Sequence, residues 1–177
     1  MKRLLLIVSP LLLIVGCSKE PINGETLIDK SGLMYEVNGQ EPYTGDVFEL
    51  YDNGNKKYKG TLKDGKVDGL LTKWYENGQK EMEKTFKDGK EDGLYITYYE
   101  SGQKGNEVTY KDGEKDGLDI IYYKNGQKVM ETNYKDGELD GLQTWWYENG
   151  QKEKERTFKD GKWISIKKWN ENGSVKE

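Results

Sequence analysis

Hydrophobic and polar residues alternate along most of this chain in short segments separated by glycine-containing turns. Residues 94–99 (Leu-Tyr-Ile-Thr-Tyr-Tyr) are rich in β-branched and aromatic residues, which favour β-strands. Residues 103–111 form a second strand-like segment, and the residues between the two segments predict a turn. In the other units this turn carries Asn-Gly, the strongest short signal for a hairpin, because both residues tolerate positive φ. Each unit is therefore predicted to be an antiparallel β-hairpin.

The unit recurs with a period of 24 residues. The tripeptide Lys-Asp-Gly marks the period, ending at Gly65, Gly89, Gly113, Gly137 and Gly161. A fixed period of this length indicates a repeat architecture, in which each unit contacts mainly its neighbours. We therefore predict an all-β fold, an elongated single-layer antiparallel β-meander built from 24-residue β-hairpin repeats.

Alternation also predicts two faces for the sheet. The apolar face is expected to carry Leu70, Leu94, Leu118 and Leu142, then Thr72, Ile96, Ile120 and Thr144, then Trp74, Tyr98, Tyr122 and Trp146, together with the return-strand residues Phe86, Tyr110, Tyr134, Phe158, Met82 and Met130. The opposite face is expected to carry Glu83, Glu107, Glu131 and Glu155 toward solvent, with Tyr75, Tyr99, Tyr123, Tyr147 and Trp145. If the sheet curls, we expect the leucines and the Phe86 column to be buried.

The first part of the chain predicts export. Met1–Arg3 is positively charged and Leu4–Val15 is apolar, but this run is shorter than the roughly 20 residues that span a bilayer. Residues 1–16 are therefore predicted to be a signal peptide, and residues 17–26 a polar tether. We expect residues 27–45 to form an N-terminal cap and residues 46–177 to form the repeat array with a C-terminal cap.

Cys17 is the only cysteine, so a disulfide within the chain is excluded. The sequence Ile14-Val15-Gly16-Cys17 resembles the bacterial lipoprotein signal, or lipobox. That resemblance implies cleavage before Cys17, acylation by fatty acids such as palmitate, and a membrane attachment through the lipid anchor. It also implies a location in the cell envelope, and in the outer membrane if the host has two membranes, because Ser18 follows the cysteine.

Charge and composition narrow the choice of partner. The net charge of −4 becomes −6 if Lys2 and Arg3 leave with the signal peptide, which disfavours nucleic acid as a partner. Thirteen Tyr and five Trp recur periodically, which argues against disorder despite the high proportion of charged residues.

The inventory of side chains argues against an enzyme and gives no reason to expect a cofactor. The chain has no His, its lone cysteine is assigned to lipid, and each carboxylate recurs in every repeat, unlike a single catalytic pair. The pattern Asp-Gly-x-x-Asp-Gly, as in residues 88–93, has two interpretations. One is a calcium site, and the one we favour is turn chemistry, because Asp bonds its own backbone and Gly supplies positive φ.

The repeat resembles the bacterial variant of the MORN repeat, from about Tyr43 to Gly173. Residues 147–152 (Tyr-Glu-Asn-Gly-Gln-Lys) and residues 63–70 and 87–94 (Lys-Asp-Gly-Lys-x-Asp-Gly-Leu) carry the resemblance. It implies stacked hairpins and a role in attachment to proteins or membranes. One group of such proteins is described as antitoxins, which implies an antitoxin- or immunity-like role. Similar repeats also accompany phosphatidylinositol phosphate kinases, but no kinase segment is present here, so we reject that function.

The aromatic columns are the candidate binding surface: Trp74, Tyr98, Tyr122, Trp146, Tyr75, Tyr99, Tyr123, Tyr147 and Trp145. Exposed aromatic patches mark interaction sites, although the same residues would also suit a core. The favoured function is a non-catalytic, membrane-anchored lipoprotein that presents this surface to a protein partner. Two alternatives remain open: binding of a glycan such as peptidoglycan, and a structural spacer in the envelope.

Overall fold

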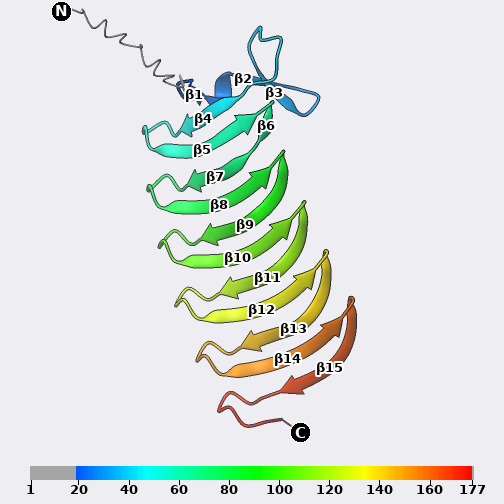
Figure 1. The fold of residues 1–177 in the computed structure, drawn as a ribbon. Coiled ribbons are helices and arrows are strands. Elements are labelled where there is room, and N and C mark those ends of the chain that lie inside the picture. The colour runs from blue at the N-terminus through cyan, green and yellow to red at the C-terminus, as the bar shows by residue number, and fades with distance from the viewer. Residues whose placement is uncertain (1–18, 177) are drawn as a thin grey trace, which may run out of the picture.

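The computed structural model describes residues 19–176, and it confirms the prediction of an all-β repeat fold. One open sheet of 13 strands runs the length of the molecule, and the strands follow one another in a twisted, elongated array (Figure 1). The predicted signal peptide and Cys17 lie outside the described residues. The strands are β1 (Ile22–Asn23), β2 (Leu27–Lys30), β3 (Leu33–Glu36), β4 (Gly45–Leu50), β5 (Lys56–Lys63), β6 (Lys66–Val67), β7 (Gly69–Trp74), β8 (Lys80–Lys87), β9 (Lys90–Tyr98), β10 (Lys104–Lys111), β11 (Glu114–Tyr122), β12 (Lys128–Lys135), β13 (Glu138–Trp146), β14 (Lys152–Lys159) and β15 (Lys162–Lys168).

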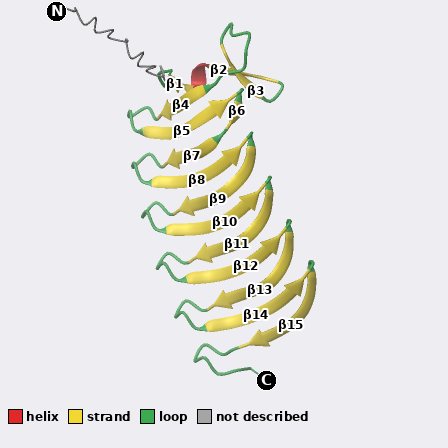
Figure 2. Cartoon of the chain, in the orientation of Figure 1, coloured by secondary structure: helices red, strands yellow, loops and turns green. Residues whose placement is uncertain are grey.

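From β7 to β15 successive strands pair antiparallel as a meander, and β5 pairs antiparallel with β4, β6 and β7. At the N-terminal end β1 joins β4 in parallel. Figure 2 shows that strands and tight turns make up almost all of the described chain. In the described part of the chain the one helical element is η1, a single 3₁₀ turn at Gly24–Thr26. Within residues 19–176, no helix is long and apolar enough to span a bilayer.

The two kinds of turn in the repeats have different backbone conformations. Positive φ at both central residues occurs at Asp-Gly, for example at Asp88 (50°) and Gly89 (80°), as a two-residue I′ turn requires. At the Asn-Gly turns of the repeats only the glycine has positive φ, as at Gly78 (86°). The Asn77 side chain accepts a hydrogen bond from the Gln79 N–H at 2.9 Å.

A second glycine in each repeat bends the strand. Gly93 of the Asp-Gly-Leu motif has φ of 118°, and a Cβ there would lie 3.0 Å from the Cβ of Thr85. Each such glycine lies opposite the aromatic residue before Lys-Asp-Gly on the neighbouring strand. These pairs are Gly69–Phe86, Gly93–Tyr110, Gly117–Tyr134 and Gly141–Phe158. The pairing register shifts beside each glycine, so the repeats carry a β-bulge at the same place.

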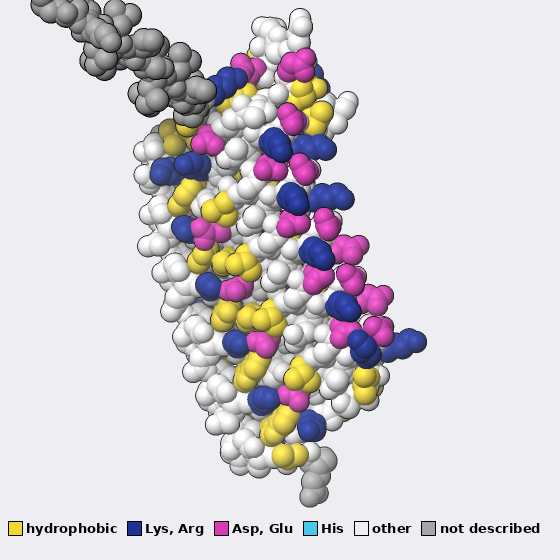
Figure 3. Space-filling view, in the orientation of Figure 1, with side chains coloured by type: hydrophobic (Ala, Val, Ile, Leu, Met, Phe, Trp, Pro, Cys, Tyr) yellow, Lys and Arg dark blue, Asp and Glu magenta, His cyan; other side chains and the backbone are white. Residues whose placement is uncertain are grey.

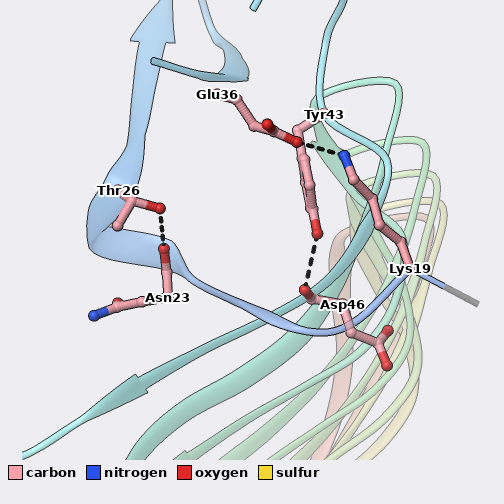
Figure 4. A network of polar contacts seen from close by, with 6 residues as sticks. All are labelled: Lys19, Asn23, Thr26, Glu36, Tyr43 and Asp46. Atoms are coloured by element: carbon pink, nitrogen blue, oxygen red, sulfur yellow. Dashed lines mark hydrogen bonds and ion pairs between the residues drawn. The ribbon is translucent and has the colours of Figure 1, made fainter.

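The predicted cap at residues 27–45 contains a separate two-stranded sheet, β2–β3, and contributes to a small core. Leu27, Tyr43 and Leu62 are buried there, and Tyr43 donates its hydroxyl hydrogen to the Asp46 carbonyl at 3.2 Å (Figure 4). The described part of the predicted tether is structured, because β1 pairs parallel with β4 and Lys19 contacts Glu36. The segment available as a flexible tether is therefore shorter than residues 17–26.

The C-terminal end of the sheet is irregular. In β13, Leu139 pairs with Tyr134 and Gln143 pairs with Thr132, so three residues form the bulge between them. In β15, Trp163 pairs with Phe158 and Ile166 pairs with Arg156, so the corresponding bulge has only two residues. The single residue missing from the last period is therefore lost from the bulge. Ile164 takes the place of the aspartate, and its side chain is 62% exposed.

Candidate functional site

The two faces of the sheet differ in how many equivalent positions carry the same residue in every repeat. We call the first the leucine face, defined by Leu70, Leu94, Leu118 and Leu142 and the side chains that project on the same side. Its strand pairs include Leu70 with Thr85, and Thr72 with Glu83. We call the opposite side the variable face. Its four columns are Leu71, Tyr95, Asp119 and Gln143; Lys73, Thr97, Ile121 and Trp145; Met82, Asn106, Met130 and Lys154; and Lys84, Val108, Thr132 and Arg156.

This arrangement corrects the predicted faces. Phe86 was expected on the same face as Leu70, but Leu70 pairs with Thr85, so the Phe86 ring projects on the variable face. The Glu83 column was expected opposite the leucines and lies beside them instead. The cause is a register shift near each turn, because one extra residue moves every following side chain to the other face.

The leucines are also more exposed than predicted. Their exposed fractions lie between 40% and 51%, so the sheet does not bury this column. Neighbouring glutamates are only partly exposed and pair with lysines, at 2.5 Å for Lys80–Glu83 and 2.6 Å for Lys152–Glu155. Figure 3 shows hydrophobic and charged side chains alternating down the sheet.

The first group of predicted site residues, Trp74, Tyr98, Tyr122 and Trp146, ends each first strand on the leucine face. Lysine ammonium groups lie near two of the rings, with Lys56 5.7 Å from the Trp74 centroid and Lys128 5.6 Å from that of Trp146. A shallow groove of about 520 Å³ beside Trp74 also contacts Leu70 and Glu83. These side chains are half-buried, so they form neither a sealed core nor an open platform.

Tyr98 is bonded within this row. Its hydroxyl donates to the Glu83 carboxylate at 2.6 Å. Burial and this hydrogen bond raise the pKa of Tyr98 to about 12. Burial opposes the charged carboxylate, but the hydrogen bonds from Lys80 and Tyr98 outweigh it and lower the pKa of Glu83.

The second predicted group, Tyr75, Tyr99, Tyr123 and Tyr147, has a structural role. Each hydroxyl donates to a backbone carbonyl of the next repeat, at 2.6 Å for Tyr75 to Tyr98 and 2.7 Å for Tyr99 to Tyr122. Tyr123 and Tyr147 make the same contact at 3.1 Å and 3.0 Å. Because the polar ends of these tyrosines are already bonded, the column joins neighbouring repeats.

The Asp residues of the turns also connect repeats. Asp68 accepts a hydrogen bond from the Asp88 N–H at 3.0 Å, and Asp92 accepts one from Asp112 at 3.4 Å. Gly89 and Gly113 donate to carbonyls of the preceding repeat at 2.9 Å and 2.8 Å. The Asp side chains therefore bond the backbone of the next repeat and not their own as expected, whereas the positive φ expected at glycine is present at Gly89 and Gly93. Among residues 19–176, no group of three or more acidic side chains is placed to hold a metal ion.

The variable face carries the deepest side chains of the array. Val108, Asp119 and Thr132 lie side by side on β10, β11 and β12, with exposed fractions of 2%, 5% and 1%. A groove of about 450 Å³ opens further along the face and is lined by Lys73, Tyr95 and their neighbours. Lys115 pairs with Asp119 at 2.5 Å, but the second Asp119 oxygen has no partner among the described residues.

Trp145, the last predicted site residue, lies on the variable face and not beside Glu155 as expected. Lys154 is 3.7 Å from its ring centroid and the Arg156 guanidinium is 5.4 Å away. Sequence reasoning missed both cations. A signal was available, because Arg156 is the only arginine outside the first three residues.

Comparison with known proteins assigns the repeats. Residues 67–88, 91–112, 115–136 and 139–160 match the family model described as MORN repeat variant, and no curated protein matches the chain. Each matched segment contains one pair of strands, the first being β7 and β8 and the last β13 and β14. This repeat type is non-catalytic and generally mediates binding. Residues 67–160 of the chain are therefore four MORN-variant repeats.

Proposed function

We propose that this chain is a lipid-anchored, non-catalytic binding protein that holds a protein partner on its variable face. The supporting observation is the contrast between the faces. The Leu, Glu and Lys columns of the leucine face are identical in all four repeats, whereas every column of the variable face defined above differs from repeat to repeat.

Differences among repeats favour a partner that does not itself repeat. Stacking requires the turn glycines, the bulge and the tyrosine contacts, which recur in every unit. Leu71, Tyr95, Asp119 and Gln143 occupy equivalent positions yet differ in size, polarity and charge. A surface of this composition offers a distinct set of contacts at each repeat, as specific recognition of a folded protein requires.

The anchor and the location are part of the proposal. Acylation of Cys17 would hold the array at a membrane of the cell envelope, and several acyl chains bind more stably than one. An exported position suits neutralisation of a protein outside the cytoplasm, which is how an antitoxin- or immunity-like role would operate here.

Adjacent residues on one strand allow a matched experiment. A photo-crosslinking amino acid at Tyr95 projects on the variable face, whereas one at Leu94 projects on the leucine face of the same strand. We expect irradiation of cells producing the full chain to link one protein to position 95 and not to position 94. Crosslinking from position 94 alone would contradict the choice of face, and no crosslink from either would contradict protein binding.

The anchor is tested separately. Cells grown with an alkyne analogue of palmitate should label the wild-type chain and not the Cys17→Ala variant. Equal labelling of both, or labelling of neither, would contradict the lipid anchor without affecting the crosslinking result.

The leucine face favours a second candidate, binding of an extended glycan such as peptidoglycan. Its aromatic row, Trp74 to Trp146, recurs every second strand, which is about 9.5 Å along the sheet. Such a regular row suits a polymer that itself repeats. Retention of purified peptidoglycan by the wild-type chain, lost in Trp74→Ala plus Trp146→Ala with unchanged circular dichroism, would support it. Equal retention by both proteins would exclude this row as the glycan site.

A further inference from the structure

Cationic and aromatic side chains gather on the variable face at the last repeat. We call this group the tryptophan–arginine cluster, comprising Trp145, Lys154, Arg156, Trp163 and Lys168. Strand pairing places them together, with Trp145 opposite Lys154 and Lys154 opposite Lys168. Trp163 lies opposite Phe158, whose ring is also on the variable face. The cluster therefore spans β13, β14 and the terminal strand β15.

The guanidinium of Arg156 lies between two indole rings. Its central carbon is 5.4 Å from the Trp145 centroid and 5.9 Å from that of Trp163. Cation–π contacts of this kind orient an arginine but provide no hydrogen-bond acceptor in the plane of the guanidinium. Trp163 is 62% exposed, so the cluster is open to solvent on the side of β15.

The positive charge of this cluster is not neutralised within the described chain. Lys152 pairs with Glu155 on the leucine face, and Lys159 pairs with Asp140 at the turn edge. Within residues 19–176, Lys154, Arg156 and Lys168 form no ion pair, and the buried Nε of Arg156 has no hydrogen-bond partner. Lys154 and Lys168 lie directly opposite each other, which is unfavourable for like charges.

Earlier repeats satisfy the same positions internally. Lys84 occupies the column of Arg156, and it pairs with Glu91 while lying 4.4 Å from the Tyr95 ring centroid. Lys115 pairs with Asp119 in the next repeat. β15 instead supplies Trp163 at the position of Glu91 and Ile164 at the position of Asp140. Lys84 and Lys115 therefore each have an acidic partner, whereas within residues 19–176 no acidic side chain pairs with Lys154, Arg156 or Lys168.

We propose that the tryptophan–arginine cluster binds an acidic, extended segment of the protein partner. Carboxylates of that segment would accept hydrogen bonds from Arg156 and separate the charges of Lys154 and Lys168, and an apolar side chain would cover Trp163. The inference rests on the proposed function and adds the chemistry of the partner. Charge complementarity selects an acidic occupant, because three uncompensated cations lie together on a chain of net charge −4.

The experiment follows the side-chain N–H signals of Arg156 and the tryptophans by NMR, with the full chain in a neutral detergent. Only Arg3 and Arg156 contribute arginine signals, so loss of one signal in Arg156→Lys assigns it. The probe is a blocked peptide of alternating Glu and Val, and its control replaces every Glu with Gln. We expect saturable shifts of the Arg156 and Trp signals with the Glu peptide and none with the Gln peptide.

Two variants separate a specific site from general attraction. Arg156→Gln should weaken binding of the Glu peptide about tenfold or more, because a charge-assisted hydrogen bond is lost. Lys159→Gln is the matched control, since it removes one positive charge from the same strand, at a lysine that pairs with Asp140 at the turn edge, and should leave affinity unchanged. Equal weakening by both variants would overturn the proposal, as would binding only to vesicles that contain anionic phospholipid.

The outcomes also distinguish this inference from the proposed function. Crosslinking from position 95 with no response of Arg156 to the Glu peptide would contradict the proposed acidic segment and would still support protein binding. A response of Arg156 without any crosslinked protein would leave an acid-binding cluster on a chain whose protein partner is disproved.

Discussion

The tyrosines predicted to bind a partner differ in the hydrogen bonds that their hydroxyl groups make. Tyr99 donates to the Tyr122 carbonyl at 2.7 Å, whereas no hydrogen bond from the Tyr122 hydroxyl occurs within residues 19–176. We expect Tyr99→Phe to lower the free energy of unfolding by about 1 kcal/mol, because a carbonyl loses its partner. Tyr122→Phe is the control and should be nearly neutral. Urea unfolding measures both, and equal effects would contradict a special role for the Tyr99 column.

The ionisation of Tyr98 gives a pH-dependent test. Its pKa is raised to about 12 from an ordinary value of 10.0, mainly by burial and then by the bond to Glu83. Between these two pH values the folded chain keeps a proton that the unfolded chain loses, so stability falls as pH rises through this window. Urea midpoints of the wild type should therefore drop more steeply there than those of Tyr98→Phe. Parallel curves would show that Tyr98 titrates normally in the fold.

Glycines with positive φ differ in what a side chain would meet. A Cβ at Gly117 (φ 118°) would lie 3.1 Å from the Thr109 Cβ, whereas one at Gly126 (φ 84°) meets nothing within 4 Å. Gly126→Ala should cost about 1–2 kcal/mol of backbone strain alone. Gly117→Ala should cost at least about 1 kcal/mol more, because bulge and side-chain packing must also shift. Comparable losses in urea unfolding would mean that the bulge yields readily.

At the scale of the element, strands and turns could be predicted from the sequence because each depends on local residues. Alternating β-branched and aromatic residues placed the strands, and Gly-containing dipeptides placed the turns. The sequence did not predict which side chains of neighbouring strands lie on the same face of the sheet, because this depends on one-residue shifts near Trp74 and at the bulge glycines. Those shifts reflect backbone geometry that the alternation pattern does not record.

The same limit affected the candidate site. The prediction placed the side chains of the return strands on the wrong faces. It therefore divided the four columns that differ among repeats between both faces, although they lie on one face. Trp145 was predicted as a site residue, but Lys154 and Arg156 beside it were not. Once the register is known, the contrast between the identical Leu, Glu and Lys columns of one face and the four varying columns of the other follows directly from the sequence.

At the scale of the whole molecule, the array has no central core, and each repeat is held by its two neighbours. The clustered buried residues lie where the cap meets the array, with Leu27 and Tyr43 from the cap and Leu62 from β5, whereas the repeats bury only a few side chains, such as Val108 and Thr132. Stability should then increase with the number of stacked repeats, because each adds its own contacts and one interface.

Removal of one full period tests this additivity. Deleting residues 115–138 joins Glu114 to Leu139 and restores the Lys-Asp-Gly-Glu-Leu-Asp-Gly-Leu sequence found at residues 135–142. We expect the shortened chain to keep its β circular dichroism, with a smaller urea m-value and a lower free energy of unfolding, since less surface is buried. Deleting residues 115–137 instead leaves one extra residue between the same strands.

That extra residue is the matched control, because it would exchange the two faces for all strands that follow. The chain lacking 115–137 should therefore lose cooperative unfolding, or lose far more stability than the chain lacking 115–138, although it is one residue longer. If both deletions unfold alike, register across the bulge is not what holds neighbouring repeats together. The variable face would then have no fixed composition, and recognition by a sheet of stacked hairpins would need another explanation.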